Sequence, residues 1–156
     1  VYNYKIFREL YENNVSTLSF LLKSANSISS DDIKLSERLY IPGKRLRGFE
    51  SGKVGPKDGS DFIGGNYASS INATTTIPMI LENVQSVDIV LFADAANIWG
   101  VDYNSSLDKA GIRSSVGIGI DWLTPVGPLT FSFAQPITKE STDIEETFRF
   151  NIGTSF

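Results

Sequence analysis

At 156 residues the chain is long enough for one domain with a hydrophobic core, and its length indicates nothing larger. Its 14 basic and 18 acidic residues give a net charge of −4, which argues against a nucleic-acid-binding protein that depends on phosphate contacts. Cysteine and histidine are absent, which excludes disulfides, Cys/His metal sites and histidine-based catalytic triads. No apolar run approaches the ~18 residues of a membrane helix, which excludes a helical membrane protein.

Apolar residues recur at every second position through most of the chain. Between Ile112 and Leu123, for example, the apolar residues Val116, Ile118 and Ile120 alternate with glycine and aspartate. This period of two is typical of a β-strand. It recurs, with less regularity in some segments, over residues 2–11, 15–28, 66–77, 87–99, 129–137 and 147–156. The pattern predicts an all-β, antiparallel fold of about seven strands.

The length of these strands distinguishes a membrane barrel from a soluble β-sandwich. Most have ~10–12 residues, close to what a tilted strand needs to cross a bilayer and longer than the 5–6 typical of soluble sheets. Short and long connections alternate, as in outer-membrane barrels with short periplasmic turns and long outer loops. Trp99 and Trp122 lie at strand ends, as in an interfacial aromatic girdle. The first segment, residues 2–11, fits less well, because Arg8 falls on its apolar face.

The longest connection runs from about Ser29 to Gly64 and carries a distinctive tip. Connections in compact domains have a median of about 4–6 residues, so such a long one usually has a function. In its middle, Arg47 offers a planar fork of donors, Gly48 permits a backbone turn that other residues rarely adopt, and Phe49 supplies a large apolar side chain. These properties suit a tip that inserts into a cavity.

This tip resembles the lumen-inserted loop of the Omp85 family of outer-membrane barrels, in particular of its BamA-type assembly factors. Arg47-Gly48-Phe49 is followed at the family's spacing by Gly55-Pro56-Lys57 and Gly64-Gly65-Asn66. The likeness continues, in order, through Phe92-Ala93-Asp94, Ile98-Trp99, the segment from Gly127 to Pro136, and the segment from Phe148 to Phe156.

The resemblance implies an antiparallel transmembrane β-barrel of which residues 1–156 form the C-terminal part, with the loop of about residues 29–64 inserted in the lumen. Earlier barrel strands and periplasmic POTRA domains are expected to precede them. The family pattern also implies that Arg47 pairs with Asp94 on the inner wall. A second acid of that pattern would align near Thr74, where this sequence has none.

The last segment resembles the terminal signal by which outer-membrane proteins are recognised for assembly. Its alternation places four residues outward, with Gly153 between them: Phe148, Phe150, Ile152 and Phe156. On this reading the terminal aromatic lies at the periplasmic membrane interface.

The function implied is that of a non-enzymatic factor in the outer membrane of a Gram-negative bacterium, without a cofactor or metal, which folds nascent β-barrel proteins into the membrane. Expected partners are membrane lipid, nascent β-barrel proteins and the assembly lipoproteins of the family, and no nucleic acid. Two alternatives are a related translocation pore, TamA-like or of the two-partner secretion type, and a soluble β-rich binding module.

Other residues invite simpler interpretations. Glycines 117 and 119 would leave room in the lumen for Phe49. Arg113 and Asp121 could form an ordinary lumen pair. Two acidic pairs in loops are expected to be solvated charge: Asp31-Asp32 and Glu145-Glu146.

Overall fold

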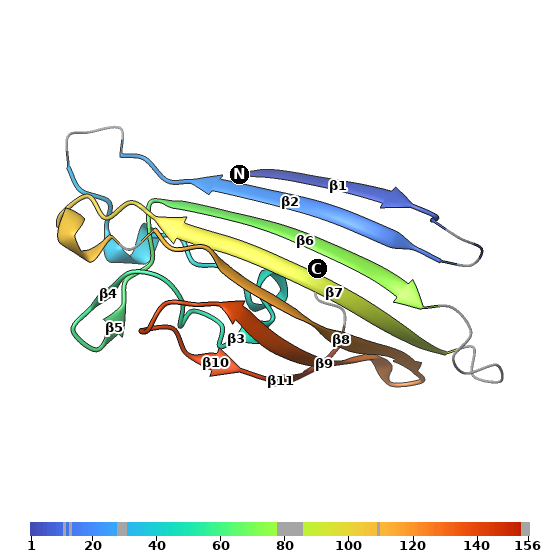
Figure 1. Cartoon of the computed structure of the whole chain (residues 1–156). Coiled ribbons are helices and arrows are strands. Elements are labelled where there is room, and N and C mark those ends of the chain that lie inside the picture. Colours follow the sequence, from blue (N-terminus) through green and yellow to red (C-terminus); the bar gives the residue numbers. More distant parts are fainter. Residues whose placement is uncertain (11, 13, 28–30, 78–85, 109, 154–156) are drawn as a thin grey trace.

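The computed structural model describes residues 1–10, 12, 14–27, 31–77, 86–108 and 110–153. Seven strands form one antiparallel sheet in the order β1-β2-β6-β7-β8-β9-β11 (Figure 1). Their bounds are Tyr2–Arg8 for β1, Ser16–Ser24 for β2, Tyr67–Ile77 for β6, Val87–Trp99 for β7, Arg113–Thr124 for β8, Gly127–Thr138 for β9 and Phe148–Ile152 for β11. The predicted all-β, antiparallel sheet of about seven strands is therefore confirmed. No helix among the described residues is long and apolar enough to cross a membrane.

The short elements lie in three connections. Between β2 and β6 are the 3-10 turns η1 (Leu35–Glu37) and η2 (Gly43–Arg45) and the two-residue strands β3 (Gly48–Phe49), β4 (Lys57–Asp58) and β5 (Asp61–Phe62). The other two are η3 (Ser105–Leu107), before β8, and β10 (Glu145–Glu146), before β11. We call residues 25–66 the motif loop and residues 139–147 the C-terminal loop.

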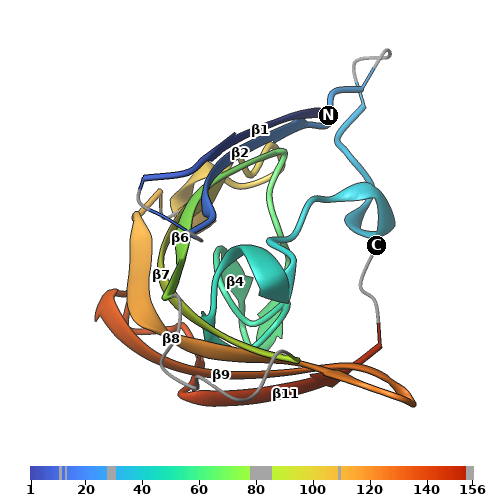
Figure 2. The same cartoon turned by 90° about the vertical axis from the view of Figure 1, so that its right-hand side faces the viewer.

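The sheet is curved, and the motif loop lies against its concave side (Figure 2). The apolar core sits between the two: Ile41, Leu46, Phe49 and Val54 from the loop, and Ala68, Ala96 and Ile98 from β6 and β7. The sheet has two ends. At the turn end lie Arg8, which closes β1, and the two-residue turn from Thr124 to Gly127. At the loop end the motif loop leaves β2 and enters β6 (Figure 1).

The convex face is apolar and exposed. Leu18 and Phe20 on β2 are 44% and 38% accessible, and Val116 and Phe133 further along the sheet are 44% and 48% accessible. Aromatic rings also pair across β9 and β11 on this face, with Phe133 and Phe148 4.9 Å apart between centroids. A contiguous apolar outer face is what lipid-facing strands present, whereas a β-sandwich would bury it.

The strand ends differ from the predicted ones at the end of β2, which closes at Ser24 instead of residue 28, and near the first turn. The first predicted strand ran to Tyr11, but β1 ends at Arg8. The Asn14 side chain accepts a hydrogen bond from the Leu10 amide and donates to Thr75 and to the Thr76 carbonyl. These side-chain contacts replace the strand ladder there, which alternation alone does not indicate.

Candidate functional site

The motif loop is fastened at the loop end before it turns inward. Arg38 forms an ion pair with Asp102 in the connection after β7, and Leu39 exchanges backbone hydrogen bonds with Gly65 at 2.8 and 3.0 Å. Burial alone would raise the pKa of the Asp102 carboxyl, but hydrogen bonds from the Ile33 amide, Asn66 and Arg38 lower it from 3.8 to about 2. The Leu39–Gly65 pair joins the two arms of the loop, and the Arg38–Asp102 pair ties the first arm to the connection after β7. From these anchors the tip enters the concave side.

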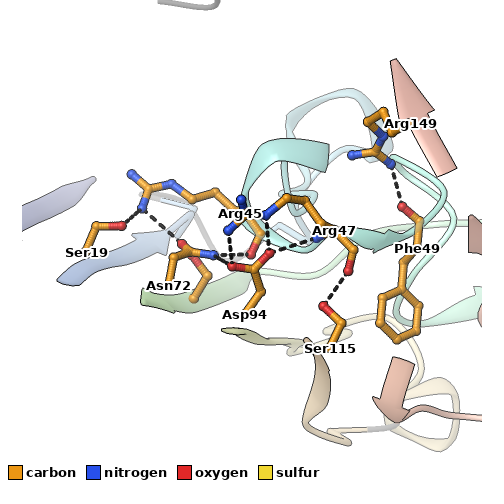
Figure 3. Close-up of polar contacts among 9 residues, drawn as sticks. Ser19, Arg45, Arg47, Phe49, Asn72, Asp94, Ser115 and Arg149 are labelled. Carbon is orange, nitrogen blue, oxygen red and sulfur yellow. Dashed lines mark hydrogen bonds and ion pairs between the residues drawn. The ribbon is translucent and has the colours of Figure 1, made fainter. Parts of the chain in front are cut away.

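At the tip, Arg47 and Asp94 form the contact expected from the family pattern (Figure 3). Nε and Nη2 of Arg47 lie 2.7 Å from the two carboxylate oxygens of Asp94, and the Arg47 amide donates to the same carboxylate at 3.1 Å. The Asp94 side chain is fully buried and that of Arg47 is 19% exposed. This is the bidentate geometry that makes arginine–carboxylate pairs strong.

An aromatic ring supports the same arginine. The guanidinium of Arg47 lies 3.5 Å from the ring centroid of Phe92, within the range of a cation–π contact. A side chain at Gly117 on β8 would collide with that ring. The prediction that Gly117 and Gly119 make room for Phe49 is therefore wrong: Gly117 makes room for Phe92, and a Cβ at Gly119 would have only Phe131 and Val90 as near neighbours.

Asn72 completes the shell around Asp94. It lies directly opposite Asp94 in the β6–β7 ladder, and its amide donates to Asp94 Oδ1 at 2.8 Å and to the Arg45 carbonyl at 2.8 Å. Thr74, where a second acid was considered, lies two residues further along, opposite Phe92. Sequence reasoning missed Asn72, although the strand periodicity placed it on the same inward face.

Arg45 fastens the loop to the other half of the sheet. Its guanidinium is buried and donates to Ser19 on β2 at 2.8 Å and to Asn72 on β6 at 3.2 Å (Figure 3). It also donates to Asn3 on β1 at 3.0 Å. Arg45 and Arg47, two residues apart, therefore reach strands on both sides of the tip. The sequence offered only one signal for this role, the alternation of the two arginines around Leu46.

Gly48 and Phe49 pack against the later strands. Gly48 has φ +91°, and a Cβ there would lie 3.2 Å from the Cβ atoms of Ser115 and Ala134. Ser115 also donates to the Arg47 carbonyl. Phe49 is 1% exposed in the core between loop and sheet. Glycine is needed at position 48 because both the backbone conformation and the close approach exclude a side chain.

The C-terminal loop holds the tip from the opposite side. Its strand β10 pairs with β3, and Ile144 exchanges backbone hydrogen bonds with Glu50 and Lys53 at 2.9 and 3.1 Å. Asp143 pairs with Arg113 at 2.9 Å, both side chains being fully buried, and accepts from the Gly55 amide at 3.3 Å. The suggested pairing of Arg113 with Asp121 is wrong, because the carboxylate of Asp143 takes that place.

The terminal strand also reaches the tip. Arg149 on β11 donates to the Phe49 carbonyl at 2.6 Å and forms an ion pair with Glu146, and Glu145 pairs with Lys139. The side chains of Glu145 and Glu146 are 37% and 36% exposed, so they are partly solvated as expected, but each also has a cationic partner and their backbone pairs with the motif. Asp32 of the other acidic pair is exposed.

The predicted outward residues of the last strand lie on the convex face. The exposed fractions of Phe148, Phe150 and Ile152 are 48%, 44% and 69%. Gly153 has φ +93° and donates its amide to the Pro128 carbonyl at 2.8 Å. Phe156 lies outside the described residues. The role of these residues as an assembly signal stays a prediction.

The comparison with known protein families agrees with this geometry. The sequence model of the Omp85 superfamily domain matches residues 2–156. The chain belongs to the Omp85 superfamily. A likeness that runs through the whole sheet, and not only through the motif loop, confirms the resemblance inferred from the sequence.

Relatives within this superfamily include bacterial and fungal proteins. The outer membrane protein assembly factor BamA of Neisseria meningitidis is 32% identical over 154 residues, which cover 80% of this chain and 19% of that protein. A SAM50-like protein of Schizosaccharomyces pombe is 27% identical, over 90% of this chain and 31% of that protein. The chain thus spans less than a third of either relative.

Among solved structures, BamA from Haemophilus ducreyi lacking POTRA domains 1-3 has a similar fold. The TM-score is 0.86 at 27% sequence identity, over 95% of this chain and 33% of that chain. The match covers nearly the whole of this chain, so the curved antiparallel sheet and its motif loop have the fold of the corresponding third of that structure.

Proposed function

We propose that this chain is the C-terminal part of a β-barrel in the outer membrane of a Gram-negative bacterium, and that the barrel folds nascent β-barrel proteins into that membrane. The observation that carries the proposal is the motif loop, held by Arg47 and Asp94 on the inward side of a sheet whose outward side is apolar. The relatives named BamA are assembly factors, which supports the same activity here.

The sheet suits work by strand pairing. β1 and β11 are its two outer members, and each has one side without a partner strand among the described residues. An unpaired edge is a template to which another extended chain can add by main-chain hydrogen bonds. In the whole barrel the β11 edge would meet the first barrel strand, and opening of that junction would offer a client an edge within the membrane.

The contacts of the motif loop determine which part of the barrel keeps its shape while the junction opens. Arg45, Arg47 and the C-terminal loop tie the tip to β1, β2, β6, β7 and β8 and to the residues preceding β11. The inward side therefore keeps its curvature when an outer edge exchanges partners. No covalent bond of the client is made or broken in this mechanism, so we propose a non-enzymatic role. Membrane lipid, client barrels and accessory assembly lipoproteins are the proposed partners.

Reconstitution of the full-length protein in liposomes tests the proposal. A denatured outer-membrane barrel is added as client, and its assembly is measured from the fraction that acquires heat-modifiable gel migration. At equal protein content, we expect Arg47→Ala to lower client assembly strongly. Arg47→Lys should restore only part of the wild-type assembly, because lysine lacks the bidentate fork. Lys34→Gln, elsewhere in the motif loop, should have no effect.

Two outcomes would contradict the assembly role. One is a wild-type protein that leaves client assembly at the rate of empty liposomes. The other is passage of an unfolded passenger through the liposome wall without client insertion, which would assign the chain to the translocation branch of the superfamily.

A further inference from the structure

A groove of about 670 Å³ crosses the convex face of β1, β2, β6 and β7 near the turn end of the sheet. The cross-strand register places Ile6, Leu18, Ala73 and Ala93 in one outward row. The two alanines form the floor, because their methyl groups fall short of the larger side chains on either side, while Leu91 closes the far wall. The assembly role makes no use of this groove.

The neighbouring row, nearer the turn end, is polar. Arg8, Ser16 and Thr75 lie opposite one another across β1, β2 and β6. The hydroxyls of Ser16 and Thr75 are 2.8 Å apart, and the buried Asn14 accepts from the first at 2.9 Å and donates to the second at 2.8 Å. The groove is thus divided into an apolar part and a polar end.

Arg8 gives the polar end a positive charge. It is exposed, lines the groove as its one charged residue among those described there, and forms no ion pair with any residue of the described ranges. An outward arginine costs about 2–4 kcal/mol at the membrane midplane and about 0–1 near the interface. Its place as the last residue of β1 fits the interface, where phosphate groups lie.

We propose that this groove binds one anionic phospholipid, with an acyl chain over Ala73 and Ala93 and the phosphate on Arg8. Charge complementarity selects the headgroup, because a guanidinium matches two phosphate oxygens with parallel donors. The apolar row lies two residues further from the strand end than Arg8, which is the direction an acyl chain takes from the interface. The proposal rests on the membrane placement of the strands but does not require the assembly activity.

Photo-crosslinking in nanodiscs tests it on the full-length protein. The nanodiscs contain phosphatidylcholine with a small fraction of phosphatidylglycerol that carries a diazirine on one acyl chain. After irradiation, mass spectrometry measures the labelled fraction of the peptides that contain Leu18 and Ala93, relative to other outward segments. We expect those peptides to be enriched, and the enrichment to disappear when the same diazirine chain is carried by phosphatidylcholine.

Two variants, each with a control, separate the contribution of the Arg8 charge from that of the shape of the groove floor. Arg8→Gln should lower the enrichment on the order of tenfold, since a hydrogen bond to a charged group is lost. Lys5→Gln removes a charge from the same strand on the inward side and should leave it unchanged. Ala93→Leu should exclude the chain by filling the floor, whereas Ala95→Leu, outward but beyond the groove, should not.

Labelling spread evenly over the outward strands, or enrichment that survives both Arg8→Gln and Ala93→Leu, would overturn the proposal and leave only a fluid shell of lipid around the barrel. Client assembly measured in the same nanodiscs reports separately on the proposed function, so either proposal can fail without the other.

Discussion

The two faces of this sheet differ in which kinds of side chain they bury and expose. On the concave side, charged and amide side chains are buried and paired: Asp94 with Arg47, Arg113 with Asp143, and Asn72 with both strands and loop. On the convex side, large apolar residues such as Phe133 are exposed. A soluble protein has the reverse arrangement. The polar interior fixes where the loop lies, because each of its groups has few suitable partners, whereas apolar side chains of the exterior have no such directional contacts.

Removal of Asp94 should have the largest effect on this contrast. Asp94→Ala leaves the Arg47 guanidinium facing a buried site without its carboxylate, and breaking one partner of a buried pair costs about 3–5 kcal/mol. The expected result is a loop open to protease at Lys44 and Lys53, with a lower unfolding midpoint in urea. Asp121→Ala removes an exposed charge from the sheet and serves as the control. Equal protease resistance in both variants would show that the pair does not hold the loop.

A charge on the outer face should have the next largest effect. Phe150→Asp places a carboxylate on the lipid side of β11, at a cost below the about 2–4 kcal/mol of an outward arginine at the midplane. Asn151→Asp places the same charge on the adjacent inward position. Membrane insertion of the full-length protein, measured by resistance to urea extraction, should fall for the first variant and stay normal for the second. Loss of insertion in both variants would mean that the added charge prevents insertion whichever face of the sheet carries it.

Gly48 tests how closely the tip fits the inner wall. Gly48→Ala forces a side chain onto a residue with φ +91° and onto neighbours at 3.2 Å, and we expect a loss of about 1–3 kcal/mol in unfolding free energy. Gly52→Ala, with φ +77° and nothing within 4 Å of the added Cβ, isolates the backbone strain. A cost at position 48 no greater than that at position 52 would remove the steric argument.

The smallest expected effect is the loss of the Asp102 contacts at acidic pH. The folded pKa of Asp102 is about 2, below its usual 3.8, so its contribution to stability is fully present above about pH 4 and is lost as the pH falls toward 2. Amide exchange of Ile33, which donates to Asp102 at 2.7 Å, should accelerate across that window. Asp102→Asn should show fast exchange at every pH. A transition of Ile33 centred near pH 4 would contradict the lowered pKa.

The sheet could be predicted from the sequence because the alternation that specifies a strand lies within consecutive residues. Alternation at every second residue gives the face of each side chain directly, and it located all seven strands of the curved sheet. The ends were less accurate, as at Arg8, because side-chain contacts of Asn14 terminate the ladder from a distance of several residues.

The surroundings of the motif were only partly predictable. The pairing of Arg47 with Asp94 followed from the family pattern, but the places of Asn72 and Arg45 depend on strand register, which the sequence does not state. For Arg113 the sequence suggested only Asp121, and the pairing with Asp143 follows from a loop that folds back over the tip. Contacts made by irregular loops have no periodic signal, so the C-terminal loop could be assigned no role beforehand.

The hydrogen bond from Arg149 to the Phe49 carbonyl joins residues 100 positions apart in the chain. Contacts of such separation close late in folding, because the entropy of the intervening chain must be lost first. The motif loop therefore reaches its final position only after β11 has been synthesised and paired. A chain cut short after β9 would still bring Arg47 to Asp94 but would leave β3 without β10 and the Phe49 carbonyl without its donor. The tip thus registers whether β10 and β11 are in place, and its closure follows the pairing of these two strands.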